Sequence, residues 1–472
     1  MADSQWLPVS EIAAKVRSGE LKAADLVEQA LETIEAKKDY DAIIATTGQR
    51  ARERAKKIDG GDNKGRLAGV PFIAKDNFLV FGADTTAASN ILKGFEAPYQ
   101  ATAIEKLEAE GAICVAKANL DAFAHGASTE NSDFFTTKNP HDKTRVPGGS
   151  SGGSAAAVVL DMAPFAIGSD TGGSIRQPAS FVGAVGYKPT YGLVSRSGVV
   201  AMGSSLDVIG PLTRTVEDAA LVLDVMADRD DLDSTTIERD PAGYADPAGS
   251  LKGAKVGVIK EYLGEGLSAE VKAVVEASID KLKKAGAEIT EISLPSLPRA
   301  LAVYYILCPA EVSSNLGRYD GQRFGYSYKE AKDMDDSYTG SRGRGFGKEA
   351  KRRIMIGTYV LSSGYYDAYY KQAQTVRTKI IQEFDAAFQT VDYMLGPVTP
   401  TTAFKIGANS DDPLQMYLSD IMTAGINLAG VPGISLPAGA AGGLPVGLQL
   451  IAPQHGDRQL LGFAKQTEEV LA

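Results

Sequence analysis

The sequence predicts an α/β fold. Short apolar runs bounded by turn-forming residues alternate with amphipathic stretches along the 472 residues, which is the pattern of strands and helices packed in layers. The composition, 44% hydrophobic and 23% charged, is that of a folded globular protein. No linker, repeat or low-complexity tract marks a boundary. We therefore expect one domain over residues 1–472, with a helical segment at about 1–60 packed on it.

The elements can be assigned in order. Val27, Leu31 and Ile34 recur at helical spacing and predict helices within residues 9–60. The apolar run 69–74 predicts a buried strand that ends at Lys75, where ligands lie in open α/β sheets. Further helices are expected at 101–111, 155–160, 216–226, 269–285 and 351–370 and on to about 388, and further strands at 112–116, 165–167, 255–259, 289–294, 391–395 and 446–451.

Composition excludes several functional classes. A formal net charge of −10 makes it improbable that this chain holds a nucleic acid alone, because phosphate binding depends on lysine and arginine. Cys114 and Cys308 are too few for a disulfide framework or a cysteine-rich zinc site, and we expect both in the core and no metal. The N-terminus lacks a signal-peptide pattern, and no apolar run approaches membrane-spanning length, so a cytoplasmic location is expected.

The region 318–348 differs from the rest because it is rich in Gly, Tyr, Arg and Asp. Glycine-arginine-aromatic segments can bind RNA. Here the segment is short and interleaved with Asp333, Asp335 and Asp336, which favours a surface loop or a partner contact.

Two glycine-serine turns, 148–154 and 168–176, carry the candidate chemistry. Glycine allows positive φ and close approach, so serines between glycines are presented on accessible backbone. A phosphate loop is disfavoured because neither turn contains the required lysine. An α/β-hydrolase is disfavoured because a polar segment ending in Pro147 precedes the first turn, and His455 fits a surface turn better than a triad.

The remaining hypothesis is a serine nucleophile activated by a lysine. Serine becomes a good nucleophile when a base takes its proton, and a buried lysine with a lowered pKa can be that base. Lys75, at the end of an apolar strand, is the best-placed candidate. The alternative is that Lys75 only pairs with Asp76 or another carboxylate.

Lys75 after its strand, Gly-Gly-Ser-Ser-Gly-Gly-Ser at 148–154 and Gly-Ser-Asp-Thr-Gly-Gly-Ser-Ile-Arg-Gln-Pro-Ala at 168–179 closely resemble the amidase signature family. The resemblance implies that family's fold, with a large mixed β-sheet core flanked by helices, and a Ser-cis-Ser-Lys triad. Ser174 would be the nucleophile, Ser150 the bridging serine and Lys75 the base. Backbone N–H groups of Thr171, Gly172, Gly173 and Ser174 would form the oxyanion hole, with Asp170 and Arg176 holding the turn.

Later motifs narrow the resemblance to the A subunits of tRNA-dependent amidotransferases. They are Ser128–Ser132, Arg145–Gly149, Leu212–Asp218, Lys351–Met355 and Asp411–Leu414 through Asp420. The resemblance implies a heterotrimer with B and C subunits. This chain would hydrolyse glutamine, without a cofactor of its own, and ammonia would pass to the B subunit. That subunit would use ATP and Mg to amidate mischarged Glu-tRNA(Gln), and possibly Asp-tRNA(Asn).

Glutamine carries an α-carboxylate and an α-ammonium, so its pocket needs one positive and one negative group. Arg353 can bind the carboxylate bidentately, Asp420 can take the ammonium, and Tyr304 can add a hydroxyl. Arg352 is the neighbouring alternative to Arg353, and a structural charge is the alternative for each. The functional alternatives are a stand-alone amidase acting on small amides and a scaffold with a dead site.

Overall fold

The computed structural model describes residues 4–61, 65–410 and 412–472, so Asp411 of the late motif and the first three residues of the predicted domain lie outside the described residues. Within them, one mixed sheet of 11 strands has the order β1-β3-β2-β4-β6-β5-β10-β11-β9-β7-β8. The strands are β1 Ile43–Thr46, β2 Pro71–Lys75, β3 Ile113–Ala118, β4 Phe165–Asp170, β5 Val185–Lys188, β6 Val208–Thr213, β7 Lys255–Ile259, β8 Glu288–Ile292, β9 Tyr393–Pro397, β10 Gly433–Ala441 and β11 Leu444–Ile451.

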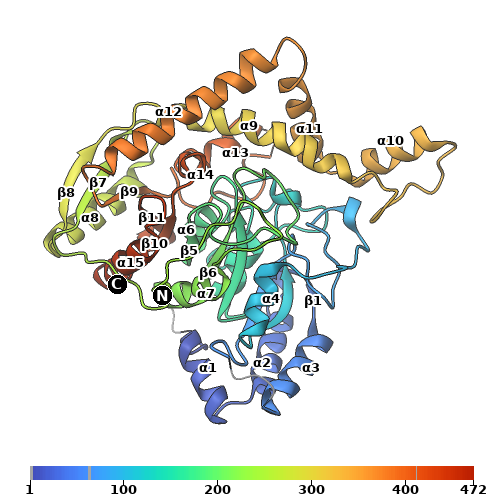
Figure 1. Cartoon of the computed structure of the whole chain (residues 1–472), viewed down its shortest axis with the longest axis horizontal. Helices are drawn as coiled ribbons and strands as arrows, with labels where there is room; N and C mark the ends of the chain where they lie inside the picture. The colour runs from blue at the N-terminus through green and yellow to red at the C-terminus, as the bar shows by residue number, and fades with distance from the viewer. Residues whose placement is uncertain (1–3, 62–64, 411) are drawn as a thin grey trace.

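Helices cover the sheet. They are α1 Val9–Ser18, α2 Ala23–Ala36, α3 Gly48–Asp59, α4 Thr102–Ala109, α5 Gly152–Val159, α6 Arg176–Val182, α7 Val216–Met226, α8 Ala269–Lys284, α9 Ala300–Asn315, α10 Met334–Gly345, α11 Lys348–Val360, α12 Gln372–Ala387, α13 Pro413–Leu418, α14 Ala424–Ala429 and α15 Asp457–Leu471. The helices α9, α11, α12 and α14 share one apolar core, whereas α1–α3, α7, α8 and α15 share another (Figure 1). The predicted α/β fold with a large mixed sheet is confirmed.

Most predicted elements are present, including β2, β3, β4, β7, β8, β9 and β11. The prediction of helices alone over 9–60 is wrong at β1, a short strand that pairs antiparallel with β3 at the sheet edge. The helix expected at 351–370 begins at Lys348 and ends at Val360, and a separate π-helical turn spans Tyr366–Lys371.

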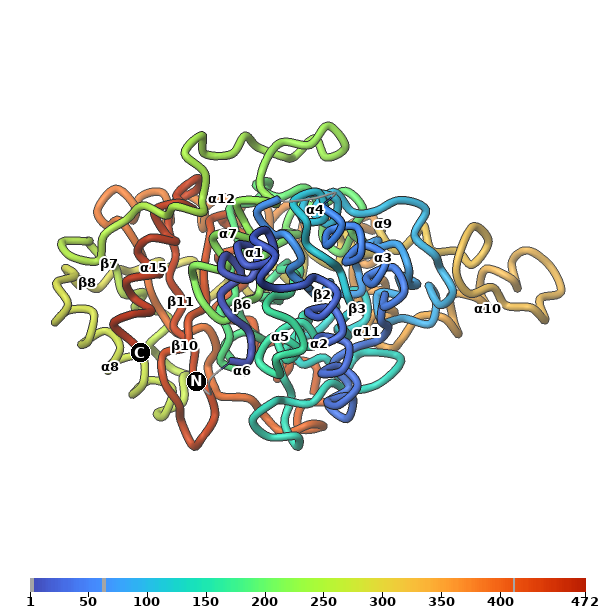
Figure 2. The backbone as a smooth tube through the Cα atoms, turned by 90° about the horizontal axis from the view of Figure 1, so that it is seen from below, coloured from blue at the N-terminus to red at the C-terminus, as the bar shows by residue number. Residues whose placement is uncertain are grey.

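The region 318–348 is not simply irregular, because it contains helix α10. Asp333 caps this helix: its side chain accepts a hydrogen bond from the N–H of Asp336 at 2.8 Å, which satisfies a free donor of the first turn. The acidic residues expected in a loop therefore start a helix. This helix extends away from the body of the molecule in both views (Figures 1 and 2).

Strands β2 and β4 position the site. They are parallel neighbours, with Phe72 opposite Phe165 and Ala74 opposite Ile167. The two phenyl rings stack with centroids 5.3 Å apart, which fixes this register by packing. Because parallel strands end at the same edge of a sheet, Lys75 at the end of β2 lies beside the end of β4 and the glycine turn that follows it.

No helix in the described part of the chain is long and apolar enough to cross a bilayer.

Candidate active site

Lys75 is fully buried and directed at hydroxyl groups. Its Nζ donates to Ser150 Oγ at 2.8 Å, to Ser151 Oγ at 2.9 Å and to Ser169 Oγ at 3.0 Å. The alternative prediction, that Lys75 serves only to pair with Asp76, does not fit, because the Asp76 carboxylate binds Lys117 Nζ at 2.6 Å. The base candidate therefore faces the first glycine-serine turn.

Burial lowers the pKa of Lys75 from 10.5 to about 7, although the charges of Asp121, Asp170 and Asp207 oppose this shift. Removing the ammonium from water disfavours its charged form. At neutral pH a large fraction of Lys75 is thus uncharged and able to accept a proton.

The two turns are joined through their backbones. The peptide bond Gly149–Ser150 is cis. Beside it, the N–H of Ser151 donates to the carbonyl of Ser174 at 3.1 Å. Ser174 is 8% exposed, whereas Ser150 is fully buried. Of Ser150 and Ser174, Ser150 is therefore the one beside Lys75. Ser174 is the one that retains access to the surface.

Asp170 and Arg176 hold the second turn. Arg176 donates through Nε and Nη2 to the two carboxylate oxygens of Asp170 at 3.0 and 2.9 Å, and both side chains are fully buried. Burial alone would raise the pKa of Asp170, but the charge and hydrogen bonds of Arg176 lower it to about 2. The turn is thus fixed by an ionised pair at neutral pH.

The turn also presents backbone donors. The N–H of Gly173 donates to Asp170 Oδ1 at 2.9 Å, so this donor is already engaged in holding the turn. The N–H groups of Thr171, Gly172 and Ser174 have no acceptor among the described residues. Of the four predicted oxyanion donors, these three are therefore the ones that are free.

Side chains of neighbouring elements lie close to Gly172 and Gly173. A Cβ added to Gly172 would lie 2.6 Å from Cζ of Tyr304, which belongs to α9. Gly173 has φ +142, and a Cβ there would lie 2.2 Å from Oγ1 of Thr423. Thr423 Oγ1 in turn donates to the carbonyl of Gly172 at 2.5 Å. The predicted binding residue Tyr304 thus lies against the oxyanion turn.

Arg353, on α11, is 2% exposed. Its Nε donates to Glu349 Oε1 at 2.9 Å, and its guanidinium lies 5.2 Å from the ring centroid of Tyr305 and 5.7 Å from that of Tyr417. Its Nη1 is buried and has no partner in the described chain. Arg352 is 41% exposed and pairs with the other oxygen of Glu349, so the buried, free donor belongs to Arg353.

Asp420, which follows α13, is the second buried charge of this region. Tyr305 donates its hydroxyl to Asp420 Oδ2 at 3.0 Å. Burial raises the pKa of Asp420 to about 7, opposed by the Tyr305 hydrogen bond and the charge of Arg353. A cation placed here would restore the ionised form.

The sequence did not point to Tyr305, Glu349 or Tyr417. The ring centroids of Tyr305 and Tyr417 lie 3.9 Å apart, and Tyr417 donates to Glu349 Oε1 at 2.9 Å. These contacts join α9, α11 and α13 around Arg353. The local sequence gives no signal of these contacts, because Tyr417 is 68 residues from Glu349 in the chain and further still from Tyr305.

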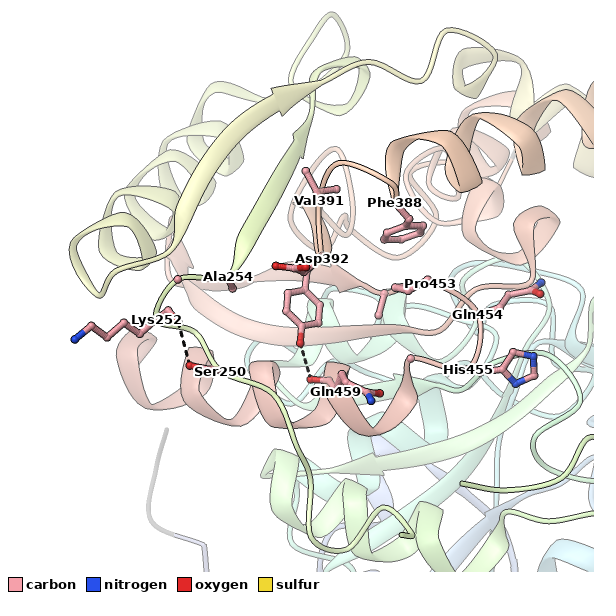
Figure 3. A pocket seen from close by; sticks show the side chains of 14 residues that line it. Ser250, Lys252, Ala254, Phe388, Val391, Asp392, Pro453, Gln454, His455 and Gln459 are labelled. Atoms are coloured by element: carbon pink, nitrogen blue, oxygen red, sulfur yellow. Dashed lines mark hydrogen bonds between the residues drawn. The ribbon is translucent and has the colours of Figure 1, made fainter. Parts of the chain in front are cut away.

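Other features of the described residues do not offer this chemistry. A cavity of about 600 Å³ lies between the end of α12, the start of β7 and the turn 452–456 that leads into α15, and Lys75 is not among the residues that line it (Figure 3). His455 lines it and is exposed with φ 64, as expected for a surface turn. Cys114 and Cys308 are free and buried, as expected. Among the described residues, no group of three or more His, Cys, Asp or Glu could hold a metal ion.

A lysine buried against serines beside a glycine turn is the arrangement that the resemblance to the amidase signature family implies. The sequence profile described as Amidase matches residues 25–461, and the chain belongs to this family. The A subunit of glutamyl-tRNA(Gln) amidotransferase from Thermoanaerobacter pseudethanolicus is 51% identical over 469 residues, 98% of this chain and 96% of that one. The corresponding protein of Koribacter versatilis is 50% identical over 477 residues, 100% of this chain and 99% of that one.

Solved structures of amidases are also similar to this chain. The crystal structure of the glutamyl-tRNA(Gln) amidotransferase A subunit from Thermotoga maritima is 40% identical, has a TM-score of 0.82 and covers 99% of this chain and 95% of that one. A peptide amidase from Stenotrophomonas maltophilia is 29% identical, with a TM-score of 0.81 over 99% of this chain and 97% of that one. The predicted resemblance to the amidase signature family and to its amidotransferase A subunits is confirmed.

Proposed function

We propose that this chain is the glutaminase subunit of a glutamyl-tRNA(Gln) amidotransferase, with Ser174, Ser150 and Lys75 as its catalytic residues. The identity of 50% or more to proteins named as the A subunit of that enzyme, across 98% of the chain, carries the proposal. The free donors and buried charges beside the glycine turn fit the chemistry that it requires.

Glutamine binds between Arg353 and Asp420. The unpaired Nη1 of Arg353 donates to the α-carboxylate. The α-ammonium binds the carboxylate of Asp420, whose pKa of about 7 then falls because a cation favours its charged form. Tyr304, in contact with Gly172, borders the side-chain amide. The two fixed charges select an amino acid over a simple amide.

Ser174 Oγ attacks the carbon of the side-chain amide. Its proton passes to Ser150 Oγ, which gives its own proton to neutral Lys75, 2.8 Å away. A hydroxyl can do this because it both accepts and donates. The negative charge that develops on the amide oxygen is stabilised by the N–H groups of Thr171, Gly172 and Ser174.

Collapse of the intermediate releases ammonia. Protonated Lys75 returns a proton through Ser150 to the departing nitrogen, and a γ-glutamyl ester remains on Ser174. Water then attacks this ester, and its proton passes through Ser150 to Lys75. Lys75 returns this proton through Ser150 to Ser174 Oγ as glutamate leaves. The lysine pKa of about 7 suits it to both directions of transfer at neutral pH.

Ammonia is then used by partner subunits. We place ATP and Mg, and the main contacts with mischarged tRNA, on a B subunit, with a C subunit completing a cytoplasmic heterotrimer. A net charge of −10 supports a partner as the tRNA-binding chain.

Isolation of the native complex tests the proposal. We expect co-purification of two further chains, and amidation of Glu-tRNA(Gln) that depends on glutamine and ATP. The runner-up, a stand-alone amidase, predicts a chain that purifies alone and hydrolyses simple amides rapidly. That result would refute the assignment to a multi-chain complex.

A further inference from the structure

His125 is a buried polar side chain that the proposed mechanism does not use. Its ring is fully buried, and neither Nδ1 nor Nε2 has a hydrogen-bond partner among the described residues. Its backbone is fixed: the N–H donates to Ala122 O at 3.0 Å, and the carbonyl accepts from Asn131 Nδ2 at 2.9 Å. Buried polar groups are nearly always paired, so the two free nitrogens of this ring leave hydrogen-bonding capacity that a ligand can use.

His125 lies near residues that we assign to glutamine binding. The positive charge of Arg353 is close enough to act on the pKa of His125. The next residue, Gly126, lines a cavity of about 120 Å³ together with Glu349 and Tyr417, which are the residues that orient Arg353. Arg353 Nη1 is itself buried and unpaired within the described chain. Two buried groups with free hydrogen-bonding atoms therefore occur in one neighbourhood.

Packing accounts for only part of the His125 environment. The ring lies 6.2 Å from the ring of Phe123, at an interplanar angle of 33°. Phe123 in turn packs on Tyr319 and Phe346. An apolar side chain would satisfy these contacts, so they do not explain a histidine.

The protonation state of His125 sets what it can bind. Burial, and secondarily the charge of Arg353, lowers the pKa of His125 well below 6.5, so the imidazole is neutral. A neutral imidazole has one N–H donor and one acceptor nitrogen. Arg353, to which we assign the α-carboxylate, is the charged residue that acts on the pKa of His125.

We propose that His125 is a glutamine-binding residue, whose ring N–H donates a hydrogen bond to the α-carboxylate beside Nη1 of Arg353. This inference rests on the proposed glutaminase function. It adds a neutral donor to the arginine, so that the carboxylate is held from two directions. His125 then contributes to selection of amides that carry an α-carboxylate.

The test compares the complex carrying His125→Phe or His125→Gln with the unchanged complex. Loss of a hydrogen bond to a charged group should raise KM for glutamine by roughly 10- to 100-fold and leave kcat within about twofold. His125→Gln keeps a donor and should recover part of the loss. His455→Phe, at an exposed position, is the matched control and should change neither constant.

A second substrate distinguishes the loss of a contact with the α-carboxylate from a general disturbance of packing. With 4-aminobutanamide, which is glutamine without its α-carboxylate, His125→Phe should change kcat/KM by less than about twofold. An unchanged KM for glutamine would overturn the inference. So would equal losses with both substrates, since a disturbed site would produce these.

Ammonia-dependent amidation reports folding and assembly and should be equal in all variants. If His125→Phe fails to assemble, His125→Met replaces it, and failure of both would overturn the inference by assigning the ring a packing role. Absence of glutamine hydrolysis in the unchanged complex would instead refute the proposed function.

Discussion

The pH dependence of glutamine hydrolysis tests two buried groups at once. Burial lowers the pKa of Lys75 to about 7 and raises that of Asp420 to about 7. Lys75 must be neutral to accept a proton, and Asp420 must be ionised to bind the ammonium. Both conditions fail as pH falls below 7. At about pH 5, two units lower, only about 1% of each group is in the required form.

The two kinetic constants should therefore respond differently. In the free enzyme both groups titrate, so kcat/KM should fall about ten-thousandfold from its plateau to about pH 5. In the complex with substrate, the bound ammonium keeps Asp420 ionised, and only Lys75 titrates. The value of kcat should then fall about hundredfold over the same interval.

The assay is the initial rate of ammonia release between about pH 5 and 9. Asp420→Asn is the control: it should bind glutamine weakly at every pH, and its kcat/KM should fall only about tenfold for each unit of pH. A kcat that stays constant down to about pH 5 would refute Lys75 as the base. A pH profile of kcat with its midpoint near pH 10, the pKa of an exposed lysine, would also refute Lys75 as the base.

Three further outcomes are expected. Ser174→Ala should abolish glutamine hydrolysis and leave ammonia-supported amidation by the complex intact, so retained hydrolysis would exclude Ser174. Arg353→Ala should raise KM for glutamine at least about tenfold without a similar change for ammonia, because a charge-assisted contact is lost; equal effects on both donors would contradict its role. Gly173→Ala should lower both activity and Tm, because its Cβ would lie 2.2 Å from Thr423 Oγ1 at φ +142. Gly343→Ala, with nothing within 4 Å, should instead stabilise α10 by about 1 kcal/mol, and equal Tm values for the two variants would contradict this.

The strands that can be found from the sequence are those whose local pattern is strong. β2 is a fully buried apolar run between turn formers and is recognisable with its end at Lys75. β1 is short and only partly buried, so it lacks the alternation that reveals a strand. β10 is rich in glycine and alanine and owes its conformation to pairing with β5 and β11. Pairing between distant strands produces no recognisable pattern in the local sequence.

The site also has features that follow from local sequence patterns and features that depend on long-range packing. Glycine turns and a lysine after a strand are local patterns, and they suffice to predict Lys75, Ser150 and Ser174. The stacking of Tyr305 on Tyr417 and the free nitrogens of His125 depend on packing between distant segments. These features required the three-dimensional structure.

Covalent trapping tests the central claim most directly. The complex is mixed with glutamine, quenched in acid within the first turnovers, digested and examined by mass spectrometry. We predict a γ-glutamyl ester on Ser174, absent in Ser174→Ala and formed far more slowly in Lys75→Met. An ester on Ser150 or Ser151, or continued glutamine turnover in Ser174→Ala, would contradict the account.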